Sequence, residues 1–234
     1  MNTNKKLILL GFCAGSIPTI TEIASENDSI TTFDVVKNIE VQNVRPFIFP
    51  GFNVNIFSDK EYDSQNFDAH PVHFAVLNSH IKYILFGYFS EKYGLKKEDF
   101  ISLNRYSSII SKSSEAGPGF LIDHFSSVST FSKIGFGVTI KRSSTLGHHC
   151  EVGDFVSLNP GVTISGNVNI GEGSEIGTGV SVVNNVSIGR HCLIGAGSVV
   201  TRDIPDGVIA YGSPCRVVRK NERWERVKQI AGKI

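Results

Sequence analysis

A six-residue repeat runs without a break through the second half of this 234-residue chain, and it restricts the fold more than any other feature. An aliphatic residue recurs at every sixth position, sixteen times in one phase. Neither a helix, with its period of 3.6 residues, nor a half-buried strand, with its period of two, keeps such a residue on one face. The repeat therefore predicts a solenoid in which short strands stack into a parallel β-helix. The repeating residues are Ile110, Ala116, Ile122, Val128, Ile134, Ile140, Leu146, Val152, Leu158, Ile164, Ile170, Ile176, Val182, Ile188, Ile194 and Val200.

Two further positions of the repeat define its cross-section. A glycine directly follows the aliphatic residue in eight hexads, and the residue four places after it is Ser, Val or Cys except at Phe120 and Ile204. We expect the aliphatic and the small residue to point inward, with glycine allowing the turn between strands. Three hexads make one triangular coil, so residues three hexads apart stack in columns. Residues 110–199 then form five coils that cover each other's backbone edges except at the two ends.

The first hundred residues lack the repeat and alternate between strand and helix patterns, which predicts a small parallel α/β domain of Rossmann-like type. The chain thus divides into a small α/β domain over 1–104, a β-helix over 105–218 and a basic C-terminal helix or tail over 219–234. We expect strands over 5–11, 30–35, 73–77, 100–103 and 208–211, helices over 17–25 and 79–93, and an irregular segment over 46–59.

The composition of the chain limits the kinds of partner that we expect it to bind. The net charge of +1 gives no reason to expect a nucleic acid. No apolar run approaches the ~18 residues of a membrane span, so no membrane partner is expected. The four cysteines lack the spacing of a metal site, and we expect no metal. Cys150 and Cys192 fall on the inward small position, which predicts buried thiols and favours a reduced, cytoplasmic setting.

The N-terminus resembles a short export signal, because Lys5 and Lys6 precede an apolar run. That run is short, and the bulky Phe12 stands just before Cys13. We therefore expect a buried first strand here.

Two segments are similar to bacterial sugar acetyltransferases of the hexapeptide-repeat superfamily, in the group of sialic acid O-acetyltransferases and UDP-4-amino-sugar N-acetyltransferases. One is SSTLGHHCEVGDFVSLNPGVTISGNVNIG, residues 143–171, and the other runs from Gly195-Ala196-Gly197 to Pro214-Cys215-Arg216. The resemblance implies a left-handed β-helix, although the general crossover rule favours the right hand. It also implies acetyl-CoA as co-substrate and a homotrimer with sites between three parallel rods.

His148 is the candidate general base. It stands at the third position of its hexad, beside the turn, so its side chain is expected to point outward. Gly166, one coil ahead, and Thr130, one coil behind, leave an open notch beside it. An exposed histidine at a coil corner is the plainer interpretation, but the resemblance places the catalytic base on His148. Histidine takes up a proton near neutral pH, as a base for an attacking amine or hydroxyl must.

His149 stands where the family commonly has a carboxylate that orients the base, and we include it among the catalytic residues. A histidine does not supply the same fixed negative charge. Either the basicity of His148 is lower, or an acid such as Asp123, Glu151 or Asp154 assists His148. That acid belongs to the same chain or to a neighbouring subunit. By resemblance, a backbone N–H near Gly166 stabilises the oxyanion.

The coenzyme contacts are also carried over from the family. Gly177 and Gly195 lie in one column on successive coils, where a ligand can approach the backbone, although glycine is also simply what the turn needs. The basic tail, residues 216–233, either attracts the coenzyme phosphates or is a solvated helix face. Carried over residue by residue, the remaining contacts fall on Ser157, Gly166, Thr178 and Ala196, with Ser157 replacing a second histidine of some relatives.

The resemblance implies that the first strand–helix turn meets the nucleotide-sugar substrate, since free N–H groups and the helix dipole there attract phosphate. Phe12 and Cys13 are bulkier than the family's residues there, and Leu77 replaces an expected glycine, so a plain tight turn is the alternative. The candidate substrate contacts are Gly11, Ala14, Gly15 and Ser16 in the turn, Asp34 at the end of the second strand, and Asn78 after the third.

Together these features predict an acetyl-CoA-dependent acetyltransferase that acts on an amino or hydroxyl group of a sugar or nucleotide-sugar in surface polysaccharide or glycan synthesis. Acetylation of a non-sugar acceptor, such as an amino acid, is one alternative. A non-catalytic β-helix scaffold or sugar-binding module is another, which the histidine beside Gly166 disfavours.

Overall fold

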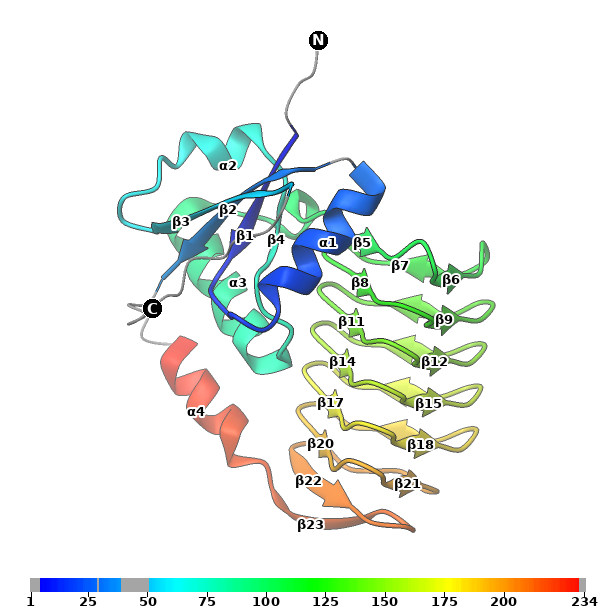
Figure 1. Ribbon diagram of the computed structural model, residues 1–234. Coiled ribbons are helices and arrows are strands. Elements are labelled where there is room, and N and C mark those ends of the chain that lie inside the picture. Colours follow the sequence, from blue (N-terminus) through cyan, green and yellow to red (C-terminus); the bar gives the residue numbers. More distant parts are fainter. Residues whose placement is uncertain (1–4, 29, 39–50, 232–234) are drawn as a thin grey trace.

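The computed structural model describes residues 5–28, 30–38 and 51–231. Its second half is a column of two-residue strands, one in each hexad, as the repeat predicts (Figure 1). The second residue of each strand from β6 to β21 is the aliphatic residue of the hexad. The strands are β6 (Ile109–Ile110), β7 (Glu115–Ala116), β8 (Leu121–Ile122), β9 (Ser127–Val128), β10 (Lys133–Ile134), β11 (Thr139–Ile140), β12 (Thr145–Leu146), β13 (Glu151–Val152), β14 (Ser157–Leu158), β15 (Thr163–Ile164), β16 (Asn169–Ile170), β17 (Glu175–Ile176), β18 (Ser181–Val182), β19 (Ser187–Ile188), β20 (Leu193–Ile194) and β21 (Val199–Val200).

Every third strand pairs in parallel, so that each residue lies beside its equivalent one coil later, as Leu146 does beside Ile164. The pairs build three flat faces, so the cross-section is the triangle expected from the sequence. Face 1 begins with β5 (Leu103–Asn104), which pairs with β8, so the first coil starts just before the expected join. Face 1 contains β5, β8, β11, β14, β17, β20, β22 and β23; face 2 contains β6, β9, β12, β15, β18 and β21; face 3 contains β7, β10, β13, β16 and β19.

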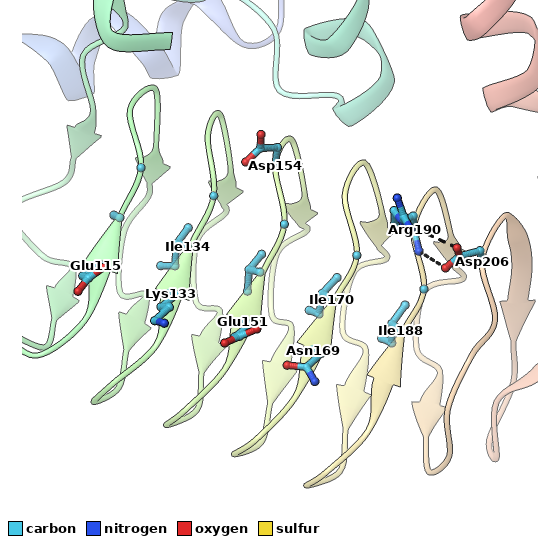
Figure 2. A pocket seen from close by; sticks show the side chains of 17 residues that line it. Glu115, Lys133, Ile134, Glu151, Asp154, Asn169, Ile170, Ile188, Arg190 and Asp206 are labelled. Atoms are coloured by element: carbon cyan, nitrogen blue, oxygen red, sulfur yellow. Dashed lines mark hydrogen bonds and ion pairs between the residues drawn. The ribbon is translucent and has the colours of Figure 1, made fainter.

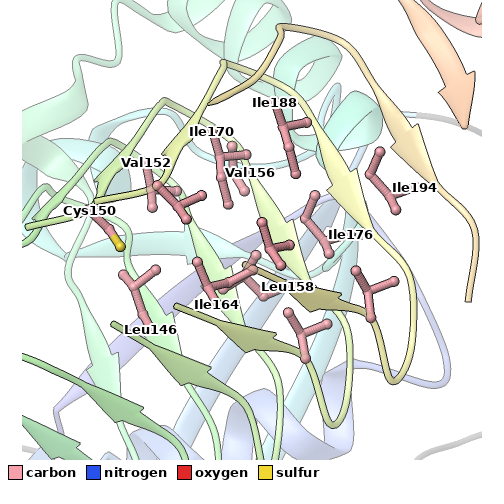
Figure 3. Packing of buried hydrophobic residues seen from close by; sticks show 14 of the residues in the cluster. Leu146, Cys150, Val152, Val156, Leu158, Ile164, Ile170, Ile176, Ile188 and Ile194 are labelled. Carbon is pink, nitrogen blue, oxygen red and sulfur yellow. The ribbon is translucent and has the colours of Figure 1, made fainter. Parts of the chain in front are cut away.

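The repeating aliphatic residues fill the interior (Figure 3). All of them are buried except Ile110, which is half-buried, and Ala116, which is exposed. The expectation of inward burial was wrong for these two, because β6 and β7 are the edge strands of their faces and no earlier coil covers them. Cys150 and Cys192 are buried at the small inward position, as expected.

The α/β domain has a parallel sheet of order β3-β2-β1-β4, with helices between its strands. The expectation of irregular chain over 46–59 was wrong for residues 53–58, which form β3, and residues 46–50 lie outside the described ranges. The first four residues of β3 alternate between Asn and a β-branched residue, the pattern of a half-buried strand, which the expectation overlooked. The elements are β1 (Lys6–Leu10), α1 (Ile17–Asp28), β2 (Thr32–Lys37), β3 (Asn53–Ser58), α2 (Gln65–Ala69), β4 (Val72–Phe74), α3 (Ser79–Tyr93) and the 3₁₀ turn Lys97–Asp99.

The chain ends in an antiparallel hairpin and a helix. β22 (Val208–Tyr211) matches the expected last strand and pairs with β23 (Arg216–Lys220). The expected helix from residue 219 begins later, as α4 (Glu222–Ala231), because the chain first extends face 1 by one strand. Residues 232–234 lie outside the described ranges. Within those ranges no helix combines the length and apolarity needed to cross a bilayer.

Aromatic side chains join the α/β domain to the corner between faces 3 and 1. Phe74 of β4 and Phe86 of α3 pack among Phe100, Phe136 and Phe155, with ring centroids 4.7–6.4 Å apart. Such aromatic contacts stabilise beyond the area they bury. The two parts therefore share a core, and the loops of the α/β domain are held against the β-helix.

A lysine crosses the same interface. Lys82 of α3 is 1% exposed, and its Nζ donates hydrogen bonds to the Gly137 carbonyl and to Thr139 Oγ1 of face 1. Burial, with a further contribution from the charge of Lys141, lowers the pKa of Lys82 from 10.5 to about 7, although the charge of Glu175 opposes the shift. The folded protein therefore holds a proton here less tightly than the unfolded chain does.

This lysine predicts a rise of stability with pH. Between pH 7 and 9 the unfolded chain protonates Lys82 more fully than the folded protein does, and stability rises wherever the unfolded state binds more protons. We expect the free energy of unfolding to increase by about 2 kcal/mol more over this range in the wild type than in Lys82→Met. Urea unfolding at the two pH values measures the difference. Lys133→Met on the outer surface of β10 is the matched control, and equal slopes for wild type and Lys82→Met would contradict the prediction.

Candidate active site

His148 and His149 lie in the turn after β12, at the corner between faces 2 and 3. Both side chains are exposed, as expected for His148. Their Nδ1 atoms are 3.0 Å apart, and the rings are nearly perpendicular at 85°. A hydrogen bond between two ring nitrogens requires a proton on one of them. With the proton on His148 Nδ1, the Nε2 lone pair of His148 is free to act as a base.

Gly166 lies directly beside this imidazole. A Cβ at position 166 would lie 2.5 Å from both Cε1 and Nε2 of His148. The expected notch exists, but the His148 ring itself fills it. The Gly166 N–H, our candidate oxyanion donor, donates a hydrogen bond to Asn184 Oδ1 at 2.9 Å. An acyl oxygen reaches this N–H only when the Asn184 amide moves away.

The three candidate acids differ in their surroundings. Asp154 forms an ion pair with Lys97 and accepts a hydrogen bond from the Phe136 N–H. Asp123 lies 3.6 Å from Arg105. Glu151 is exposed on β13. Neither of the two histidines forms an ion pair with a carboxylate of the described ranges.

The ring of His149 packs on an aromatic side chain, Phe131, and has no charged partner among the described residues. Phe131 stands one coil before His149 in the same column, and the ring centroids are 5.1 Å apart. The His149 backbone is in the left-handed region, with φ of 55°, and its N–H donates to the Thr130 carbonyl. The ring of His149 is therefore held between Phe131 and His148. Sequence reasoning missed Phe131 and Asn184, although each shares a column with a candidate residue.

Of the candidate coenzyme residues, Gly166 lies beside His148, but four others lie at a different corner. Gly177, Thr178, Gly195 and Ala196 follow strands of face 1, so they lie between faces 1 and 2. A Cβ at Gly177 would lie 2.6 Å from the Ala196 nitrogen, so coil stacking alone requires glycine there. Thr178 and Ala196 are exposed. One chain therefore does not bring this column together with the histidines.

Ser157, another candidate coenzyme contact, lies within a strand of face 1 and at neither of these corners. It is 1% exposed on face 1, and its hydroxyl donates a hydrogen bond of 2.8 Å to the Leu77 carbonyl in the loop after β4. This contact ties the β-helix to the α/β domain. A ligand would reach the Ser157 hydroxyl only by breaking it.

The turn after β1 is tight and partly exposed. Gly11 has a φ of 87° and lies against Leu85, where a Cβ would be 2.5 Å from Cδ1. Ala14 and Gly15 are exposed, whereas Ser16 is buried and its hydroxyl donates to the Ala75 carbonyl at 2.8 Å. Ala14 and Gly15 thus offer the accessible backbone of this turn. Asn78 is exposed at the N-cap of α3.

Asp34 lies within β2, so its expected position at the end of the second strand was wrong. The carboxylate is 2% exposed and is surrounded by Lys6 at 2.8 Å, Asn55 at 3.0 Å and the Tyr62 hydroxyl at 3.0 Å. Burial would raise the pKa of Asp34, but the hydrogen bonds from these partners outweigh it and hold the pKa below its ordinary value. The side chain is therefore committed to the sheet of the α/β domain.

A groove of about 840 Å³ lies on face 3 (Figure 2). Two of the candidate acids, Glu151 and Asp154, line it, but the histidines and the candidate coenzyme and substrate residues do not. Its floor is a column of glycines that includes Gly135, Gly153 and Gly171. A Cβ at any of these three would meet backbone atoms of the next coil at 2.5–2.8 Å, so the column follows from stacking. The groove is a product of the repeat and does not mark the histidine site.

Comparisons with known proteins agree with this architecture. Residues 167–202 match the family model described as bacterial transferase hexapeptide (six repeats). No curated protein sequence matched the chain. The acetyltransferase domain of PglB from Neisseria gonorrhoeae, in complex with acetyl coenzyme A, is 25% identical with a TM-score of 0.76, over 92% of this chain and 100% of that chain.

Two more distant structures share the fold. A histidine-to-asparagine mutant of perosamine N-acetyltransferase from Caulobacter crescentus, in complex with CoA and GDP-perosamine, is 22% identical with a TM-score of 0.77, over 92% of this chain and 97% of that one. WeeI from Acinetobacter baumannii is 23% identical with a TM-score of 0.74, over 92% and 100%. The three parallel faces fit the left-handed β-helix that the sequence resemblance implies. The chain therefore has an α/β domain followed by a left-handed β-helix of hexapeptide repeats, the architecture of the PglB acetyltransferase domain.

Proposed function

We propose that the protein transfers the acetyl group of acetyl-CoA to an amino or hydroxyl group of a sugar or nucleotide-sugar, in surface polysaccharide or glycan synthesis. The observation that carries the proposal is the exposed His148 ring, which lies against Gly166 with its Nδ1 bonded to His149. This pair stands on an architecture that an acetyl-CoA-bound acetyltransferase domain matches over 92% of the chain.

The proposed chemistry requires the tautomer in which His148 carries its proton on Nδ1 and donates it in a hydrogen bond to His149. Nε2 takes a proton from the acceptor amine or hydroxyl as that atom attacks the thioester carbonyl. The carbonyl oxygen gains negative charge, which the Gly166 N–H stabilises once Asn184 has moved aside. When the tetrahedral intermediate collapses, the carbon–sulfur bond breaks and His148 returns the proton to the sulfur of CoA. No acyl-enzyme forms.

We assign the acceptor and the coenzyme to different parts of the chain. We assign the acceptor to the exposed parts of the α/β domain, Ala14, Gly15 and Asn78. We assign the coenzyme arm to Thr178 and Ala196. The four free cysteines and the use of acetyl-CoA favour the cytoplasm.

A second copy of the chain completes the site. The histidines and the coenzyme column lie at the two edges of face 2, so each chain contributes two half-sites. The outward residues of face 2, such as Thr145, Thr163 and Ser181, are small and uncharged, and Phe125 and Phe131 are exposed at its two edges. We propose a homotrimer in which the histidine corner of one chain meets the coenzyme corner of the next.

Sedimentation is expected to give three times the 25.5 kDa chain mass. Thr163→Arg should dissociate this assembly and abolish transfer, because it places a charge in the uncharged face. Asn169→Arg, the equivalent change on face 3, is the control and should stay assembled. A monomeric wild type with full activity would refute the trimer.

Calorimetry with acetyl-CoA tests the function itself, because a scaffold or sugar-binding module would not bind the coenzyme. A thiol-release screen of amino-sugar nucleotides, free sialic acids and amino acids then identifies the acceptor. Turnover with amino acids alone would replace the sugar assignment, and no binding of acetyl-CoA would end the proposal.

A further inference from the structure

A second cleft, separate from the histidines, lies at the C-terminal end of face 1. It is about 390 Å³ in volume and lies between α3, α4 and the last strands of that face. Figure 1 shows α4 near the end of α3, beside β20, β22 and β23. The volume falls in the range of small-molecule sites.

The walls combine apolar side chains with an excess of positive charge. Leu193 of β20 and Ile209 of β22 form part of the apolar lining. Arg219, Arg223 and Arg226 line the same cleft, together with the half-buried His80. Arginine is the side chain best suited to bidentate recognition of phosphate.

Carboxylates offset only part of this charge. Glu222 lines the cleft, and Glu175 lies 3.5 Å from Arg223. Within the described ranges, Arg219 and Arg226 have no carboxylate within ion-pair distance. Burial and then the charge of Arg223 lower the pKa of His80, which fits a positive cleft.

The cleft is a fixed part of the fold. Trp224 of α4 is 5% exposed and stacks on His191 at 4.1 Å and 20°. The Asn221 side chain donates a hydrogen bond of 2.9 Å to the His191 carbonyl. These contacts hold α4, and with it Arg223 and Arg226, against the β-helix.

The cleft also adjoins the candidate coenzyme column. Leu193 stands two positions before Gly195 on the same coil. Ile209 stands two positions before Tyr211, and a Cβ on Gly195 would lie 2.7 Å from Tyr211 Cβ. A ligand that follows the column toward the C-terminal end of the rod therefore arrives beside the arginines.

We propose that this cleft binds the phosphate-bearing adenosine end of the coenzyme, with Arg219 and Arg226 on its phosphates and the adenine against the apolar wall. The inference rests on the proposed function, because it assumes coenzyme A as the ligand. It assigns to α4 a binding role that the repeat does not require.

Calorimetry on the full chain tests the assignment with CoA and with adenosine 3′,5′-bisphosphate as probes. The double variant Arg219→Ala/Arg226→Ala is expected to bind both at least about tenfold more weakly, since charge-assisted hydrogen bonds are lost. Its KM for acetyl-pantetheine, a donor without the nucleotide, should be unchanged. Lys60→Ala/Lys133→Ala removes the same charge elsewhere and should bind both probes like the wild type.

The outcomes separate this inference from the function. A double variant that binds CoA as tightly as the wild type overturns the cleft assignment and leaves the acetyltransferase intact. Loss of bisphosphate binding with unchanged CoA binding also overturns it, because the cleft would then serve a free nucleotide. A wild type that binds no CoA refutes both proposals.

Discussion

Replacement of His148 by alanine is expected to slow acetyl transfer by about 10²–10⁴-fold, the usual effect of losing a positioned general base. Folding and acetyl-CoA binding should be nearly unchanged, because the side chain is exposed at a corner and supports no core residue. Turnover at saturating acceptor, with calorimetry of acetyl-CoA binding alongside, measures the two effects separately. Near-normal kcat in His148→Ala would show that the proposed mechanism is wrong.

His149→Ala is the matched comparison within the same dipeptide. Its ring accepts or donates at 3.0 Å to His148 and packs on Phe131, so it orients the base without touching the acceptor in the proposed mechanism. We expect a smaller loss of kcat than in His148→Ala. If His149→Ala were the more damaging change, the two roles would have to be exchanged.

Truncation of Ile176 to alanine is expected to cost about 2–5 kcal/mol in the free energy of unfolding, the range for large-to-small changes in a packed core. Ile176 is 0% exposed within the column of aliphatic residues, and the coils on either side leave the cavity little room to collapse. Chemical denaturation of the purified protein measures the loss.

Val183→Ala is the control for this core change. Val183 belongs to the same rod but is 38% exposed, so the expected loss is below about 1 kcal/mol. Equal losses at the two positions would mean that the interior of the rod does not carry its stability.

The sequence predicted the β-helix well because each hexad repeats the same physical problem. One inward aliphatic residue and one inward small residue suffice to fix the phase of every strand. The predictions failed at the first coil, which has no earlier coil stacked on it, and beyond the last hexad, where the repeat ends. Ala116 is exposed because its strand is at an edge, and β23 was missed because its residues were assigned to the basic tail.

The site was less predictable for two different reasons. The separation of His148 from the Ala196 column was already contained in the sequence, since residues on the same corner are separated by whole coils of three hexads. The surroundings of Ser157 and Asp34, by contrast, could not be predicted from the sequence. They depend on how Leu77 and Tyr62, distant in sequence, dock against them, and no local pattern encodes that docking.

The stacking of whole coils also restricts how the length of such a rod can change. Removal of three hexads deletes one coil and keeps every column, but it draws the C-terminal part about 4.8 Å along the axis. Removal of only one hexad preserves the aliphatic phase yet turns everything beyond it by one face of the prism. The rings of Trp224 and Tyr83, whose centroids are 5.5 Å apart, would then be separated. Helix α4 would face another side of the prism and lose its contact with α3. Hexads in this half of the chain can therefore be gained or lost only in whole coils, and only as far as α4 can still reach α3.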